Sequence, residues 1–357
     1  VLSLHVGLPS DASADVGPVI EEPGTKLTEG LTDLGPGEQW LSQPRILNDD
    51  ACLITPGVRT GVQEGSAYHL TEYFGPVLGM MHADTLEEAL RLQNGTAFGL
   101  TAGLHSLDEE EIAWWTQRVQ AGNLYINRGI TGAIVQRQPF GGWKRSAVGQ
   151  TSKAGGPSYL IHLMDAHDVT DRSDEAAWAA AARHSDREVW ARELAARDVQ
   201  DLHGEINILR HLPVAVTVRA AEGSDPVELA RVLHAAQTVS APVEVSVATA
   251  DQRDAAIHAG EEPDNVRIED AATFAARVDA QTPTRIRLLG EADDALLTAV
   301  SRRVEVSLWR GEVTTSGRIE LLAFLHEQAI SATNHRYGNP LPRPLDLVGP
   351  SGFARGA

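Results

Sequence analysis

One thiol is the first candidate for chemistry in this sequence. Cys52 is the single cysteine among the 357 residues, so it is the one side chain able to form a thiolate nucleophile. Asp49 and Asp50 lie just before it, and nearby negative charge raises a thiol pKa, whereas catalysis requires a lowered one. We therefore expect Cys52 to have a structural role. A single cysteine also excludes an intramolecular disulfide and is typical of a reducing compartment.

Two motifs carry more information than the thiol. They are Glu72-Tyr-Phe-Gly-Pro76 and the run Gly132-Ala-Ile-Val-Gln-Arg-Gln-Pro-Phe-Gly-Gly-Trp-Lys144. Together they resemble the C-terminal part of an aldehyde dehydrogenase catalytic domain, in particular the L-glutamate γ-semialdehyde dehydrogenase half of the bifunctional proline utilization A proteins. A third segment, Ala14-Asp-Val-Gly-Pro-Val-Ile20, is similar to the Met-Gly-Pro-Leu-Ile segment of aldehyde dehydrogenases.

This resemblance implies roles for five residues. Glu72 would accept hydrogen bonds from the nicotinamide-side ribose of NAD, and Phe74 would pack on the same part of the cofactor. Gly132 and Ala133 would bind the α-carboxylate of the substrate through backbone N–H groups, because small residues let the backbone approach an anion. Phe140 would line the aldehyde pocket. The alternative is that Glu72 lies at a strand edge, the glycines are turn residues, and both phenylalanines belong to the core.

The rest of the chemistry is expected outside this sequence. Aldehyde oxidation requires a thiolate, donors for the oxyanion, a nicotinamide and a base that activates water. In the family, the cysteine, the base and the oxyanion-hole Asn precede the segment seen here, and Cys52 follows the Gly-Pro-Val-Ile segment. We therefore assign no catalytic residue and expect a fragment that is inactive alone. The implied partners are glutamate γ-semialdehyde, the missing N-terminal half and, in the intact enzyme, further copies of the chain. FAD would belong only to a proline dehydrogenase domain that is not present here, and the choice of NAD over NADP stays open.

Two other functions remain open. The chain could be a noncatalytic lid or assembly module, or part of an aldehyde dehydrogenase for another acyl group. The Gly132-Ala133 anchor argues against the latter, because simple aliphatic aldehydes carry no carboxylate. We expect the cations of Trp143-Lys-Arg-Ser146 in a solvated loop, and His326 and His335 in packing or tunnel-lining positions. The histidines show no ligand spacing, so no metal site is predicted.

Alternating elements are predicted around the motifs. Strands are expected at residues 1–6, 100–106 and 122–127, and helices at residues 84–92, with Asp84 as N-cap, and 108–119. This alternation predicts a mainly parallel sheet. Residues 159–164 are predicted as an apolar strand. In aldehyde dehydrogenases the corresponding strand joins the hairpin that contacts another subunit, and an ordinary edge strand is the alternative.

The second half of the sequence shows the same alternation after a polar linker at residues 165–174. One long helix or two helices are expected at residues 174–196. The further elements predicted are strands at 214–218, 243–247, 285–289 and 304–308, and helices at 226–238, 274–278 and 292–300. This pattern is Rossmann-like, but without a G-x-G-x-x-G motif we assign no dinucleotide site to it. Residues 205–210 and 321–340, the latter expected to begin as a helix, resemble the C-terminal region of the longer proline utilization A proteins.

The expected fold class is therefore α/β. Residues 1–165 would form the C-terminal part of the catalytic domain with its oligomerisation strand, 166–204 a helical linker, and 205–357 an aldehyde-dehydrogenase-like lid domain. The net charge of −19 argues against nucleic-acid partners and anionic membrane surfaces, which require a basic protein surface. No segment has the roughly 20 apolar residues of a membrane span or the pattern of a signal peptide, so a cytoplasmic location is expected.

Overall fold

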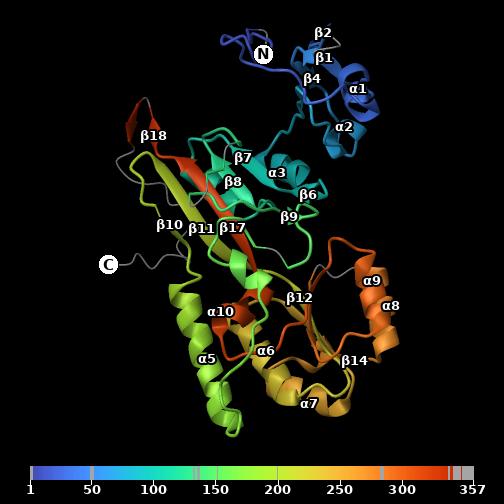
Figure 1. Cartoon of the computed structure of the whole chain (residues 1–357), viewed down its shortest axis with the longest axis vertical. Coiled ribbons are helices and arrows are strands. Elements are labelled where there is room, and N and C mark those ends of the chain that lie inside the picture. Colours follow the sequence, from blue (N-terminus) through green and yellow to red (C-terminus); the bar gives the residue numbers. More distant parts are fainter. Residues whose placement is uncertain are drawn as a thin grey trace. The chain divides into compact units, whose positions relative to one another are not determined.

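The structure is a computed structural model that describes residues 3–48, 52–131, 133–134, 137–150, 152–198, 200–281, 285–336, 338–340 and 347 (Figure 1). The chain forms two compact units, Val1–Ala97 and Phe98–Ala357. Both contain helices and strands, which confirms the predicted α/β class. The predicted boundary near residue 165 does not separate these units, because strands from both sides of it share one sheet.

The first unit is built on a small sheet with the strand order β1 (Gln39–Ser42), β4 (Gly57–Thr60) and β5 (Val77–Gly79). Strands β2 (Ile46–Asn48) and β3 (Leu53–Ile54) form a separate antiparallel pair. The helices are α1 (Thr25–Thr32), α2 (Ala67–Leu70) and α3 (Leu86–Asn94). Its small core joins α1 to these strands through Leu27, Leu31, Ile54, Val19, Tyr73 and Val77.

Two local predictions in this unit need correction. The N-cap of α3 is Thr85 rather than Asp84, because the Thr85 hydroxyl accepts a hydrogen bond from the backbone N–H of Glu88 at 3.1 Å, which satisfies a donor of the first turn. The strand expected at residues 1–6 is wrong over the described residues, where only Val6 pairs, in an isolated bridge with Val16.

The first sheet of the second unit is mixed and draws its strands from distant parts of the sequence. Strands β7 (Thr101–Leu104) and β8 (Asn123–Ile126) are connected by helix α4 (Glu109–Thr116), which has Asp108 as its N-cap and ends three residues before the predicted end at residue 119. The sheet has the order β10-β11-β17-β8-β7, and its remaining strands are β10 (Arg197–Asp198), β11 (Glu205–Pro213) and β17 (Leu325–Thr333). Figure 1 shows β17 between β11 and β8.

The pairing of β17 explains why one helix prediction fails. Residues 321–340 begin as a short 3₁₀ helix, η4 (Leu321–Phe324), and continue as strand β17. This strand pairs antiparallel with β11 along its whole length, from Leu325 opposite Pro213 to Thr333 opposite Glu205, and parallel with β8. Hydrogen bonds on both edges thus outweigh the local helix preference. Beyond it, β18 (His335–Arg336) and β19 (Asn339–Pro340) pair with each other, while β6 (Phe98–Gly99) pairs with β9 (Trp143–Lys144).

The second sheet of this unit is entirely parallel, in the order β14-β13-β12-β15-β16. This order confirms the Rossmann-like prediction. Its strands are β12 (Val216–Ala220), β13 (Val243–Val247), β14 (Val266–Ile268), β15 (Arg285–Leu289) and β16 (Ser307–Trp309). The helices of this region are α5 (Glu175–Arg192), α6 (Pro226–Thr238), α7 (Ala250–His258), α8 (Ala271–Gln281), α9 (Asp294–Ser301) and α10 (Gly317–Glu320), with a 3₁₀ turn, η3 (Pro263–Asn265).

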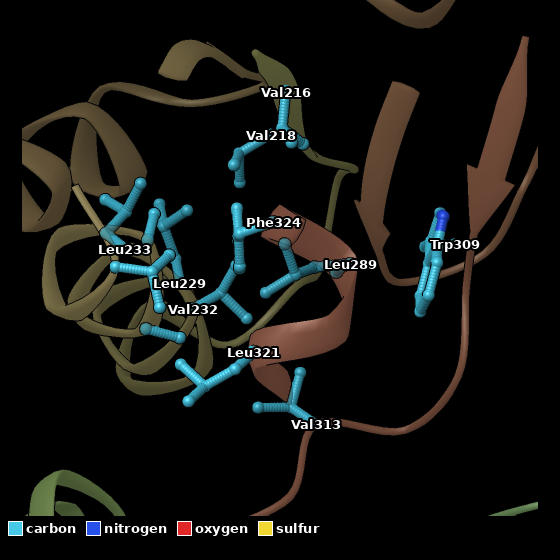
Figure 2. Packing of buried hydrophobic residues seen from close by; sticks show 14 of the residues in the cluster. Val216, Val218, Leu229, Val232, Leu233, Leu289, Trp309, Val313, Leu321 and Phe324 are labelled. Atoms are coloured by element: carbon cyan, nitrogen blue, oxygen red, sulfur yellow. The ribbon is translucent and has the colours of Figure 1, made fainter. Parts of the chain in front are cut away.

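The core of this region gathers β12, α6 and η4. Figure 2 shows Phe324 of η4 beside Val218 of β12 and Val232 of α6, all fully buried. Helix α6 begins where predicted, because Asp225 caps it by accepting from the N–H of Val227 at 2.8 Å and Pro226 occupies its first turn. Proline there loses no helical hydrogen bond. The C-terminal 3₁₀ turn thus completes the hydrophobic core of the parallel sheet.

A buried ion pair lies at the contact of α5, α6 and α10. Arg231 donates two hydrogen bonds to the carboxylate of Asp186, at 2.7 and 2.8 Å, and both side chains are at most 1% exposed. Burial raises the pKa of Asp186, against the opposing effect of Arg231. Gly317 lies beside it, where an added Cβ atom would be 2.8 Å from the Asp186 Cα atom. Only glycine therefore permits this approach of α10 to α5.

The strand predicted at residues 159–164 is wrong. Tyr159–Leu163 form a 3₁₀ helix, η2, whose backbone hydrogen bonds are local. The N–H of Ile161 donates to the Ser158 carbonyl oxygen, and the N–H of Met164 donates to the Ile161 carbonyl oxygen. Ser158 is fully buried and accepts hydrogen bonds from Arg318. These local bonds replace a strand ladder and leave four apolar side chains exposed, those of Tyr159, Leu160, Leu163 and Met164.

Candidate cofactor and substrate sites

The Glu72–Pro76 motif presents an exposed aromatic ring. Tyr73 is held by the core, since its ring stacks on Tyr68 with centroids 4.8 Å apart and lies where a Cβ atom on Gly30 would be. Gly75 packs against α1, and an added Cβ atom on Gly75 would lie 2.2 Å from Leu27 Cδ1. Between these fixed points Phe74 is 80% exposed. The packing of Tyr73 and Gly75 therefore fixes the backbone on both sides of Phe74, while the Phe74 ring stays in solvent.

The conformation of Phe74 is itself unusual. Its φ is +56°, a left-handed conformation that costs a non-glycine residue about 1–2 kcal/mol. An exposed ring gains no burial to offset that cost, so the reading of Phe74 as a core residue is wrong. Glu72 is exposed as well, and the Lys26 amine lies 6.0 Å from the Phe74 ring centroid. An exposed carboxylate acceptor beside an open ring face suits a ligand that has hydroxyl groups and an apolar surface.

The predicted anchor loop is described in part. Gly132 lies outside the described residues, while Thr131 and Ala133 are exposed. The loop closes at Ile134, whose carbonyl oxygen accepts from the backbone N–H groups of Arg137 and Gln138 at 3.0 and 2.9 Å. The Gln138 side-chain oxygen in turn accepts a hydrogen bond from the backbone N–H of Ile134 at 3.2 Å. Ile134 is therefore bonded to both Arg137 and Gln138.

A buried polar network ties this loop to the C-terminal strands. Gln138, only 3% exposed, donates to Asn207 Oδ1 of β11 at 3.1 Å and to Ser331 Oγ of β17 at 2.9 Å. Ser331 donates in turn to Asn207, and Arg128 donates to Ser331 at 2.6 Å. Satisfied buried networks fix one arrangement of their members. These residues were not predicted, since nothing in the local sequence pattern around Asn207 or Ser331 indicates a link to the loop.

Phe140 lies in the same unit and is half-buried. Its backbone exchanges two hydrogen bonds with Ala154, at 3.0 and 2.9 Å, which fixes the chain on both sides of the ring. Glu72 and Phe74 belong to the first unit, whereas Ala133 and Phe140 belong to the second. The structure therefore describes the two predicted parts of the site separately.

Cys52 lies at the start of β3 with a φ of +53°. Its carbonyl oxygen accepts from the backbone N–H of Val19 at 3.1 Å, so its backbone has a structural contact. In the described part of the chain, no group of three or more His, Cys, Asp or Glu side chains is arranged to hold a metal ion. No described helix has the length and apolar character needed to span a membrane.

Comparisons with known proteins show similarity in the first half of the chain. Residues 1–169 match the model of the Aldehyde dehydrogenase family. A 1-pyrroline-5-carboxylate dehydrogenase of Geobacillus sp. (strain WCH70) is 37% identical over 169 residues, which cover 47% of this chain and 32% of that protein. The corresponding Bacillus subtilis (strain 168) protein is 36% identical over 170 residues, with coverages of 47% and 33%.

A solved structure extends the likeness beyond residue 169. Proline Utilization A (PutA) from Corynebacterium freiburgense matches with a TM-score of 0.76 at 38% identity, covering 95% of this chain and 33% of that one. The chain thus spans about a third of the length of these relatives. Residues 1–169, which make up 47% of this chain, are therefore similar to the aldehyde dehydrogenase family.

Proposed function

We propose that this chain is the C-terminal part of an NAD-dependent L-glutamate γ-semialdehyde dehydrogenase. The reaction is glutamate γ-semialdehyde + NAD⁺ + H₂O → glutamate + NADH + H⁺, and the semialdehyde is in equilibrium with 1-pyrroline-5-carboxylate. The observation that carries the proposal is the exposed, left-handed Phe74 beside the exposed Glu72 carboxylate. The names of the relatives supply the substrate.

The residues present fit a nicotinamide dinucleotide. Glu72 accepts hydrogen bonds from the two ribose hydroxyls, and Phe74 packs against the ribose and nicotinamide, which buries the ring that is now 80% exposed. The bound cofactor supplies the hydride acceptor. Ala133, with Gly132, binds the α-carboxylate through backbone N–H groups, and Phe140 lines the path of the aldehyde chain. The Gln138 network positions this anchor loop.

The nucleophile, the base and the oxyanion donors come in this proposal from an N-terminal half supplied by the rest of the enzyme. Uncovered apolar side chains on the strands of the first unit support such a partner: Leu41 of β1 is 61% exposed and Leu78 of β5 is 56% exposed. The 357-residue chain alone is then inactive. A cytoplasmic location and a homo-oligomeric intact enzyme remain predictions of the same proposal.

The test is NADH formation at 340 nm from 1-pyrroline-5-carboxylate, first with this chain alone and then after mixing with a separately expressed N-terminal half that carries the cysteine motif. We expect no activity alone and activity on mixing. In the mixture, Phe74→Ala raises the KM for NAD about tenfold, because the ring contact is lost, while the exposed control Ile20→Ala leaves it unchanged.

Two outcomes would refute the proposal. Activity of the chain alone that disappears in Cys52→Ala would make Cys52 the nucleophile. A cooperatively folded chain that restores no activity with the N-terminal half would favour the noncatalytic lid or assembly module instead.

A further inference from the structure

The second unit contains a cavity of about 780 Å³ that the proposed reaction does not use. It is lined by the loop that contains β9, by the residues after α4, and by parts of β11, β15, β16 and β17. This volume lies within the roughly 300–1,000 Å³ range of small-molecule sites. Glu72, Phe74, Ala133 and Phe140 are not among the described residues that line it.

One wall of the cavity is apolar and aromatic. Trp143 meets His326 edge to face, with ring centroids 4.9 Å apart, and its indole N–H donates to the Glu327 carbonyl oxygen at 2.9 Å. Val119 and Leu212 extend this wall. Because the indole N–H is already bonded, the Trp143 ring is held in place, and a fixed aromatic surface suits the apolar body of a ligand.

The charge of the lining is opposite to that of the chain. Its basic residues outnumber its acids five to two, whereas the whole chain has a net charge of −19. The basic residues are Arg118, Lys144, Arg145, Lys153 and Arg285, and the acids are Glu305 and Glu327. Burial lowers the pKa of Lys153 to about 7, so it is only partly protonated at neutral pH, and the other four still outnumber the acids. Positive charge concentrated in a cavity with low-dielectric walls attracts anions.

The two most buried basic groups of the lining are oriented by neutral oxygens. Lys153 donates to the Gly141 carbonyl oxygen at 2.5 Å and to Asn123 Oδ1 at 3.2 Å. Arg285 donates to three backbone carbonyl groups within 3.2 Å, those of Leu322, Ala323 and Leu325. Such bonds hold a cation in position without cancelling its charge. The positive field reaches His326, whose pKa falls to about 3, first through burial and then through Arg285 and Lys153. The field that disfavours a proton on His326 favours an anion.

One buried hydroxyl of the lining, Ser152 Oγ, has no hydrogen-bond partner within the described residues. A buried donor without a partner is unfavourable, and an anionic ligand would accept a hydrogen bond from it. The backbone of Lys144 has a φ of +51°, and its side chain is half-buried. The expectation of a solvated loop is therefore wrong for Lys144.

We propose that this cavity binds a small organic anion, a carboxylate or a phosphate monoester, whose charge lies among Lys144, Arg145 and Lys153 and whose apolar body lies against Trp143. The basis is the combination of one aromatic wall, a surplus of oriented basic groups and the unpaired Ser152 hydroxyl in a volume of ligand size. The proposal concerns this cavity alone and does not depend on the dehydrogenase reaction.

The experiment is a ¹⁹F NMR titration of the full 357-residue chain with three probes of similar shape: 4-fluorobenzoate, 4-fluorophenyl phosphate and 4-fluorobenzyl alcohol. We expect saturable one-site binding of at least one anion and at least tenfold weaker binding of the neutral alcohol. The benzoate and phosphate arms distinguish the two sources of the charge. Lys144→Gln should weaken the preferred anion at least tenfold, whereas the matched Arg187→Gln, an exposed cation of α5, should not.

A second variant keeps the test decisive if Lys144→Gln disturbs folding. Ala215 lines the cavity and is exposed, so Ala215→Trp fills space without entering the core and should abolish binding while the circular dichroism spectrum is kept. The proposal is overturned if neither anion binds below 10 mM, if the alcohol binds as tightly as the anions, or if a folded Lys144→Gln or Ala215→Trp variant binds like Arg187→Gln.

Discussion

Replacing Lys153 by methionine would measure how strongly burial opposes its charge. The Lys153 side chain is almost fully buried, at 2% exposure. Burial lowers its pKa from 10.5 to about 7, against the opposing charge of Glu327. A neutral amine still has two N–H donors for Gly141 and Asn123, so the folded state accommodates loss of the proton. Methionine has a similar shape and no ionisable group.

The direction of the pH effect follows from the lowered pKa. Between about pH 7 and 10.5 the unfolded chain holds the Lys153 proton and the folded chain does not, so the free energy of unfolding rises with pH. The slope approaches about 1.4 kcal/mol per pH unit, and the rise between pH 7 and 9 is roughly 2 kcal/mol. This stability is complete above pH 10.5 and is lost as the pH falls towards 7.

Urea denaturation at pH 7, 8 and 9 would test this. The difference in unfolding free energy, wild type minus Lys153→Met, should grow by roughly 2 kcal/mol from pH 7 to 9, since other groups titrate alike in both proteins. In the variant Asn123 Oδ1 loses the Lys153 donor at every pH, whereas Gly141 keeps the Asn123 amide at 3.1 Å. The cost of that lost hydrogen bond does not depend on pH, so the slope carries the test. The exposed control Lys26→Met should track wild type. Parallel pH profiles for wild type and Lys153→Met would refute the reasoning.

Two further predictions concern the contact of α5, α6 and α10. Asp186→Ala leaves the buried Arg231 charge without its carboxylate. It should lower the unfolding free energy measured in urea by about 3–5 kcal/mol, and adding Arg231→Met should recover part of that loss. A loss below about 1 kcal/mol would contradict an ion pair shielded from water. Gly317→Ala forces a Cβ atom against the α5 backbone, so it should cost about 1–3 kcal/mol of stability and lower the Tm. The control Gly311→Ala has no atom within 4 Å of its added Cβ and should keep the wild-type Tm. Equal Tm values for the two variants would count against the close approach of α10 to α5.

Elements with strong local signals were predictable from sequence. Helix Pro226–Thr238 has the predicted bounds because its cap and its first-turn proline are adjacent in sequence. Strands Val243–Val247 and Arg285–Leu289 also match. Two larger failures occur at Tyr159–Leu163, an apolar run that forms local hydrogen bonds instead of a strand ladder, and at Leu325–Thr333, a segment of mixed polarity that becomes a strand because β11 and β8 pair with it. Short apolar runs fit helix and strand equally well until those partners are known.

For the candidate site as well, the residue identities were predictable from sequence and the long-range contacts were not. The identities of Glu72 and Phe74 follow from a motif, but the exposure and positive φ of Phe74 depend on Tyr73 and Gly75 packing on either side. The Gln138 network was beyond sequence reasoning, since its hydrogen bonds join residues 69 and 193 positions apart. Nothing periodic relates such residues, so only the fold brings them together.

The place of β17 in its sheet has a consequence for biosynthesis. Ala329 of β17 pairs with Asn123 of β8, so a ribosome adding about 5–20 residues per second needs roughly 10–40 s to deliver the partner of β8 after β8 itself. During that interval the β8 edge offers unpaired N–H and C=O groups, an aggregation hazard for any strand. Nascent chains that stop before Leu325 lack the middle strand of the sheet, and we expect them to require a chaperone to remain unaggregated until β17 is made.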